Sequence, residues 1–250
     1  MTAARAVVVV PVYRPAPTAD EAVAFARCLE VLRRHPIVLV APDGLDLRAY
    51  TAGAPLAVER LAPGYFASIA SYNRLLLEPR FYERFLAYDY MLLYQLDAFV
   101  FADRLLSWCE AGYDYIGAPW MDRSLLRVML HISRSWPPSR PRLRGLSNAV
   151  GNGGFSLRRV QAHLDCLRRY EAKARCWDIN EDYFWSLYVP GRGEGFSIPT
   201  YRRALQFAFE TEPAACLALN RGALPFGCHG WDRYGRDFWR PIFRHLGYRI

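Results

Sequence analysis

The sequence lacks several features that would assign it to a class of protein at once. It has no apolar run of about 18 or more residues, so we expect no membrane-spanning segment. Its six cysteines form no Cys-x-x-Cys pair, which argues against a zinc cluster and favours reduced thiols in a cytoplasmic protein. The apolar run Val7–Val10 is too short for a secretory signal. There are no internal repeats and no low-complexity tract.

Lysine is also nearly absent. Lys173 is the only one, so arginine supplies almost all of the positive charge behind a net charge of +8. A basic balance favours an anionic partner, a group that includes nucleotides, nucleic acid and anionic membrane surfaces. Apolar residues make up 52% of the chain and aromatic residues 15%, which predicts a globular protein with a large core.

The first half of the chain alternates in the manner of an α/β protein. Residues 6–12 form an apolar run typical of a central strand, residues 19–34 fit a helix, and residues 37–40 fit a second buried strand. A strand, a helix and a strand in this order predict a right-handed crossover and a parallel sheet. Ligands of such sheets bind beyond the carboxyl ends of the strands.

We find no convincing linker and therefore expect one domain over residues 1–250. Residues 1–120 would form a nucleotide-binding half. Residues 121–147 hold six arginines and three prolines, and we interpret them as a basic loop or insertion over the site. Residues 148–250 would form the acceptor and catalytic half, which finishes in a basic aromatic tail, Trp231–Ile250.

A single carboxylate interrupts the apolar and aromatic run Leu92–Val100. We interpret the run as a buried strand carrying Asp97, whose burial requires a cation, strong donors or a strand-end position that faces a cleft. Gln95 precedes it by two residues and would share its face. The two side-chain oxygens could hold Mg²⁺ or Mn²⁺; the alternative is a strand-end aspartate bonded to backbone donors.

Two further motifs contain clustered glycines or paired carboxylates. The segment Gly151–Gly154 would let the backbone approach a ligand closely, although a tight turn also explains it. Glu181 and Asp182 follow Asn180, which fits a helix cap, so they either compensate the helix dipole or supply a general base. The helix end would lower the pKa of that base, and desolvation by neighbouring aromatic residues would offset this effect.

Two candidates for binding a metal or a phosphate remain. His229 stands between two glycines, and an imidazole there could bind a divalent metal or a phosphate, although a lone histidine is more often structural. Arg74 directly follows Asn73 and is a candidate for binding a diphosphate, with an exposed surface arginine as the alternative.

The order of these motifs resembles that of the GT-A-fold glycosyltransferases, which carry an acidic metal motif, a glycine loop, a Glu-Asp motif and a late metal-binding histidine. The sequence is more closely similar to a microbial family that is catalogued as a domain of unknown function and regarded as glycosyltransferase-like. The likeness extends from about Tyr65 to Trp231 and rests on these segments: Ser71–Asn73, Tyr94–Phe99, Tyr115–Trp120, Gly151–Leu157, Glu181–Asp182 and Gly227–His229.

The resemblance implies a GT-A-like, Rossmann-like α/β fold with a mixed, mainly parallel sheet flanked by helices. It implies that Asp97 contacts the metal and the diphosphate. The turn at Gly153 and Gly154 would line the acceptor or donor-sugar side. By the same likeness, Asp182 would be the base of an inverting transfer, with Glu181 beside it.

The resemblance also implies that His229 is the second metal ligand. The chain departs from the family pattern at Gln95, where that pattern has an acidic residue. An amide is a neutral and weaker ligand, so this departure argues against a strict dependence on Mn²⁺ or Mg²⁺. Arginines could neutralise the leaving diphosphate instead. Asn73 and Arg74 would then belong to the donor-binding side.

The implied activity is transfer of a sugar from a nucleotide-sugar donor to a hydroxyl of a saccharide or lipid-linked acceptor, in the synthesis of a bacterial surface polysaccharide or glycoconjugate. The tail Trp231–Ile250 could contact the inner face of an anionic membrane. Nucleotidyl transfer is an alternative, but it would need more carboxylates around the metal than Asp97 alone. A non-enzymatic nucleic-acid binder is another, but it leaves the buried carboxylates unexplained.

Overall fold

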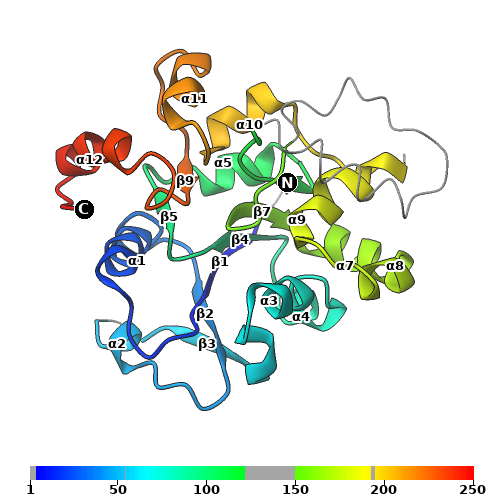
Figure 1. Ribbon diagram of the computed structural model, residues 1–250. Coiled ribbons are helices and arrows are strands. Elements are labelled where there is room, and N and C mark those ends of the chain that lie inside the picture. The colour runs from blue at the N-terminus through cyan, green and yellow to red at the C-terminus, as the bar shows by residue number, and fades with distance from the viewer. Residues whose placement is uncertain (1–3, 54, 122–149, 193–194) are drawn as a thin grey trace.

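The computed structural model describes residues 4–53, 55–121, 150–192 and 195–250, and its strands form two sheets (Figure 1). The larger sheet has the order β3-β2-β1-β4-β7-β6. Its strands are β1 (Ala6–Pro11), β2 (Ile37–Pro42), β3 (Ala57–Leu61), β4 (Tyr90–Tyr94), β6 (Tyr115–Ile116) and β7 (Phe155–Arg159). The smaller sheet has the order β5-β9-β8, with β5 (Ala98–Val100), β8 (Ala208–Phe209) and β9 (Gly227–His229).

The pairing within the larger sheet is mixed. β3, β2, β1 and β4 pair in parallel, whereas β7 pairs antiparallel with both β4 and β6. The mainly parallel sheet expected from the sequence is therefore confirmed. The valine run of β1 is buried along its whole length, as a central strand between two layers of helices requires.

Helices cover both faces of this sheet (Figure 1). None of those within the described residues is long and apolar enough to cross a bilayer. The α-helices are α1 (Ala19–Val31), α2 (Arg48–Thr51), α3 (Ile69–Leu75), α4 (Pro79–Glu83), α5 (Leu105–Glu110), α7 (Val160–Arg169), α8 (Glu171–Arg175), α9 (Glu181–Tyr183), α10 (Tyr201–Phe207), α11 (Pro213–Leu219) and α12 (Arg236–His245). Single turns are η1 (Pro63–Phe66) and η4 (Pro190–Arg192), and a π-helix, η3 (Phe184–Tyr188), follows α9.

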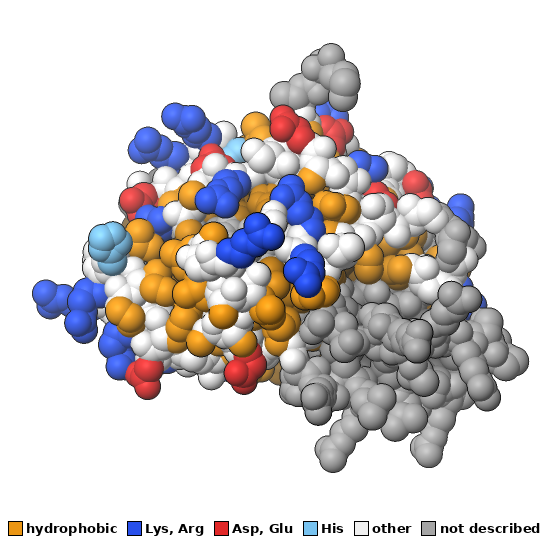
Figure 2. All heavy atoms as spheres, turned by 90° about the horizontal axis from the view of Figure 1, so that it is seen from above, with side chains coloured by type: hydrophobic (Ala, Val, Ile, Leu, Met, Phe, Trp, Pro, Cys, Tyr) orange, Lys and Arg blue, Asp and Glu red, His pale blue; other side chains and the backbone are white. Residues whose placement is uncertain are grey.

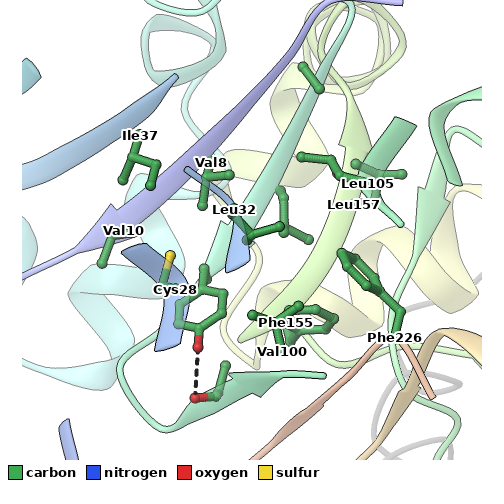
Figure 3. Packing of buried hydrophobic residues seen from close by; sticks show 14 of the residues in the cluster. Val8, Val10, Cys28, Leu32, Ile37, Val100, Leu105, Phe155, Leu157 and Phe226 are labelled. Carbon is green, nitrogen blue, oxygen red and sulfur yellow. Dashed lines mark hydrogen bonds between the residues drawn. The ribbon is translucent and has the colours of Figure 1, made fainter. Parts of the chain in front are cut away.

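Alternate residues of β1 build two separate cores, because successive side chains of a strand point to opposite faces. Val8 and Val10 pack with Cys28 of α1, with Leu32 directly after this helix and with residues of α5 (Figure 3). Val7 and Val9 pack on the other face with residues of α3, α4 and α7. A capping box at Thr18 begins α1, and this helix supplies the crossover from β1 to β2 that the sequence predicts.

The aromatic residues of the tail build a third core, which lies against the smaller sheet. Trp231, Trp239 and Phe243 are fully buried there, and Phe243 stacks on Phe99 of β5 with ring centroids 3.9 Å apart. The guanidinium of Arg27 from α1 donates to the main chain at the end of β5. The tail is thus an integral part of the fold.

The segment Leu92–Val100 does not form the single strand that its composition predicts. It divides into β4 and β5, which belong to different sheets, and the residues between them form a turn closed by the Ala98 N–H donating to the Gln95 carbonyl at 2.9 Å. Asp97 therefore occupies a turn between two sheets, which lets its side chain reach residues of both. Of the basic loop predicted over residues 121–147, all but Met121 lies outside the described residues.

Candidate functional site

The candidate site lies at the carboxyl end of β4, where the two sheets meet. The turn Gly151–Gly154 leads into β7 at this same edge, and the Gln95 N–H donates to the Gly154 carbonyl at 2.8 Å. β9 brings His229 opposite Ala98, and the Gly230 N–H donates to the Asp97 carbonyl at 2.9 Å. Three segments that are far apart in the sequence thus converge where parallel α/β sheets bind ligands.

Gln95, Asp97 and His229 form one hydrogen-bonded cluster at this edge. The Nε2 of His229 lies 3.0 Å from Asp97 Oδ1 and 3.2 Å from Gln95 Oε1. Burial alone would lower the pKa of His229, but the charges and hydrogen bonds of Asp97 and Glu210 raise it to about 10. Burial would raise the pKa of Asp97, but His229 and Arg233 lower it to about 2.

Two members of this cluster were not among the residues predicted from the sequence. Glu210, directly after β8, places Oε1 3.3 Å from His229 Nδ1, so the imidazole is flanked by acids on both nitrogens. Arg233 bonds to Asp97 Oδ2, and its side chain is 57% exposed against 23% for Asp97. It is therefore the cation of the cluster that faces solvent. In the sequence, Glu210 is marked only by its position after an apolar segment, and Arg233 only by its position four residues after His229.

The donor set at this cluster fits a divalent cation of the Mg²⁺ or Mn²⁺ type. A carboxylate, an amide oxygen and an imidazole are ligand types that such a cation accepts, and here they lie 3.0 and 3.2 Å apart around His229 Nε2, bonded to one another. The described residues contain no group of three or more His, Cys, Asp or Glu side chains arranged to hold a metal. A cation at Asp97 and His229 would thus need the Gln95 amide, water or substrate oxygens to complete its shell, and the imidazole would have to release its proton.

Gly153 and Gly154 have no room for a side chain because two functional groups occupy that space. A Cβ at Gly154 would overlap the imidazole of His229, and a Cβ at Gly153 would overlap the Glu181 carboxylate. The two glycines therefore let His229 and Glu181 approach neighbouring residues of the same turn. Glycine is therefore required at both positions by packing alone, independently of any ligand.

A buried ion pair fixes the Glu-Asp motif to β7. Arg158, fully buried, donates to Glu181 Oε1 at 2.8 Å and to Oε2 at 3.3 Å. The hydroxyls of Tyr82 and Ser156 each accept from the same guanidinium at 3.0 Å. Asn73 from α3 accepts from the Glu181 N–H at 3.2 Å. Arg158 directly follows the segment Gly151–Leu157, and nothing in the sequence identified its partner.

Asp182 lies next to this ion pair and keeps partial solvent exposure. Desolvation, followed by the negative charges of Glu181 and Glu210, raises its pKa to about 8. The helix end was expected to lower this pKa, but α9 is only three residues long, and desolvation dominates. Asn180 stands at the N-cap position as predicted, but its side chain makes no capping bond.

Arg74 is the one candidate that the structure places apart from the cluster. Its guanidinium donates to the Ala174 carbonyl at 2.9 Å, where it ties α3 to α8. The other candidates gather around the turn at Gly153 and Gly154, either directly or, like Asn73, through the Glu181 main chain.

The fold of this chain is similar to the folds of several solved structures. The chain is similar to the galactosyltransferase LgtC in complex with donor and acceptor sugar analogues, with a TM-score of 0.59 and 16% identity over 96% of this chain and 94% of that one. It is also similar to apo mouse xyloside xylosyltransferase 1, with a TM-score of 0.53 and 12% identity over 89% and 96% of the two chains. A third match is a glycosyltransferase involved in glycosylation of the major capsid of PBCV-1, with a TM-score of 0.51 and 12% identity over 98% and 100%.

These similarities place the fold in the class of GT-A glycosyltransferases. The chain belongs to the protein family described as "Protein of unknown function (DUF5672)", whose model matches residues 55–229. No curated protein sequence matches the chain significantly.

We predict that Arg158→Met destabilises the fold by about 3–5 kcal/mol, because it leaves the Glu181 carboxylate buried without a counter-charge. The measurement is the free energy of unfolding in urea. The matched control is Arg168→Met, which removes a surface pair with Glu83 (3.0 Å) and should cost less than about 1 kcal/mol. Equal losses for the two variants would contradict the assigned importance of the buried pair.

Proposed function

We propose that this protein transfers a sugar from a nucleotide-sugar donor to an acceptor hydroxyl. One observation carries the proposal: His229, which bonds to Asp97, lies against Gly154, and Glu181, which directly precedes Asp182, lies against Gly153 of the same turn. In a GT-A fold, such an arrangement brings a diphosphate-binding cluster and a carboxylate base to one ligand.

In this proposal the cluster around Asp97 binds the donor diphosphate. Asp97, His229 and the Gln95 oxygen would hold Mn²⁺ or Mg²⁺, which would supply positive charge to the leaving group. Arg233 lies beside Asp97 on the solvent side and would donate to the same phosphate oxygens. Gln95 makes the metal site weaker than an acidic residue would. The positive charge of Arg233 compensates for this, because it stabilises the negative charge that develops on the diphosphate without requiring a metal.

Asp182 acts as the general base of the transfer. It accepts the proton of the acceptor hydroxyl, whose oxygen attacks the anomeric carbon from the face opposite the diphosphate. The bond from that carbon to the diphosphate oxygen breaks, and the nucleoside diphosphate leaves with the bonding electrons. A pKa of about 8 suits a base that works near neutral pH, because a carboxylate of ordinary pKa is a much weaker base.

Glu181 has a different role in this proposal, because both of its oxygens are bonded to Arg158. It positions Asp182 and raises its pKa.

The wider setting that we propose is the synthesis of a surface polysaccharide or glycoconjugate, with a saccharide or lipid-linked acceptor. The net charge of +8 supports an anionic donor without selecting among nucleotides.

The direct test of the function is binding and turnover of nucleotide-sugars. Thermal unfolding in a panel of nucleotide-sugars, with and without Mn²⁺, should show a raised Tm for at least one donor, because a ligand that binds the native state stabilises it. That donor should then yield a nucleoside diphosphate on incubation with acceptors. Release of pyrophosphate instead would indicate nucleotidyl transfer, and no stabilisation by any donor would contradict the proposal.

Asp182→Asn should reduce turnover by roughly a hundredfold or more while donor binding persists, because the amide cannot accept the proton. Initial rates and donor Kd values measured together separate these effects. The control is Asp178→Asn, a neighbouring acidic position to which the proposal gives no role. A variant Asp182→Asn that transfers sugar at the parental rate would remove Asp182 from the mechanism. Retention of the donor's anomeric configuration in the product would contradict direct displacement.

The pH profile should follow the raised pKa of Asp182. Below about pH 8 the carboxyl is increasingly protonated and cannot act as a base, so kcat/KM should fall roughly tenfold per pH unit. Glu210→Gln removes one of the charges that raise this pKa and should move the inflection to lower pH. Glu171→Gln, which changes an exposed carboxylate on α8, should leave it in place. A flat profile from pH 5 to 8 would be incompatible with Asp182 as the base.

A further inference from the structure

A concave feature lies away from the candidate site, beside α12 and the residues that follow it. It is a cavity of about 390 Å³ lined by Arg240, Arg244, Tyr248, Arg249 and Ile250. Figure 2 shows Lys and Arg side chains gathered at the left edge of the molecule, the side on which α12 and the C-terminus lie in Figure 1. None of the lining residues belongs to the cluster around Asp97.

The positive charge of this cavity is only partly compensated. Arg240 bonds to Asp237 at 2.7 Å, whereas Arg244 and Arg249 are exposed and no acidic residue lines the cavity. Arg240 and Arg244 lie four residues apart on α12, so their charges repel each other on the same helix face. Compensation of the helix dipole explains Arg244 in the last turn, but it explains neither Arg240 nor Arg249, which follows the helix.

The frame that holds these arginines is ordered by the core of the tail. The Tyr248 hydroxyl donates to Glu30 of α1 at 2.6 Å, and the Tyr248 N–H donates to the Phe243 carbonyl at 2.9 Å. Phe243 and Trp239 anchor the inner face of α12 in the third core. The part of the backbone that carries these arginines is therefore held by the core of the tail.

The burial of the tail also decides what kind of ligand fits. Of the large hydrophobic side chains that are exposed among the described residues, Tyr234 is the one that falls in the tail. The described tail thus presents few strongly exposed apolar side chains, and its exposed arginines are the groups that would meet an anionic surface. Guanidinium groups recognise phosphate oxygens bidentately, and a cavity of this volume admits a group of headgroup size.

We propose that the cavity lined by Arg240, Arg244 and Arg249 is a second anion site, which binds a phosphate-bearing group outside the glycosyl-transfer site. The group is either a soluble phosphate compound or the phosphate of an anionic lipid headgroup. The proposal does not depend on the proposed function, because it rests on a cavity away from the glycine turn and on residues that take no part in the transfer.

The test compares the full-length protein with a double variant, Arg244→Gln and Arg249→Gln. Both positions are exposed, so the fold should be unaffected, which circular dichroism and the Tm verify. The matched control is Arg48→Gln with Arg175→Gln, which removes the same charge from exposed positions on α2 and α8. The probes are inorganic pyrophosphate, followed by calorimetry, and vesicles of equal parts phosphatidylglycerol and phosphatidylcholine, followed by sedimentation.

We expect the double variant to bind at least one probe roughly thirtyfold more weakly than the parent, and the control variant to bind it normally, since each arginine at an anionic surface contributes about fivefold. Loss confined to the vesicles identifies a lipid phosphate, and loss that includes pyrophosphate identifies a soluble one. Unchanged binding by the double variant, equal loss in the control, or no binding of either probe by the parent would overturn the proposal. Glycosyl transfer with a soluble acceptor should be the same in all three proteins.

Discussion

The arrangement of the candidate site depends on the ion pair between Arg158 and Glu181. Both groups are removed from water, a costly state that becomes tolerable because all three nitrogens of the guanidinium donate to acceptors, which include the Gly153 carbonyl. Arg158 stands on β7, which pairs with β4 on one side and β6 on the other, so its backbone is held within the sheet. The pair transmits that rigidity to a short segment, α9, which has only three residues and could not hold a fixed orientation by its own hydrogen bonds.

The second constraint is the change of sheet between β4 and β5. A continuous strand would have kept Asp97 within one layer. The turn at residues 95–97 instead sends the chain into the smaller sheet, where β9 delivers His229 and β8 delivers Glu210. The tail core stabilises that smaller sheet through Phe99. The position of the imidazole thus depends on aromatic packing contributed by the last residues of the chain.

The sequence predicts most of the fold, because hydrophobic periodicity and turn residues are local signals. It also brings Asp97, His229 and the Glu-Asp motif to attention, because a carboxylate in an apolar run and a histidine between glycines are conspicuous in one dimension. Arg158, Glu210 and Arg233 escape notice because an arginine or a glutamate near a strand looks like a surface residue until its partner is known. The pKa of Asp182 shows the same limit. The dipole of a helix is readable from capping residues, whereas the desolvation that overrides it depends on packing.

The close approach of Gly154 to His229 links two positions that are 75 residues apart in the chain, from 154 to 229. The imidazole occupies the space that any side chain at position 154 would need, so the identity of one residue restricts the other. Among homologous chains, a histidine at the second position should therefore be accompanied by glycine at the first. A chain that has replaced the histidine with a small residue is freed from that restriction, and the two positions should covary.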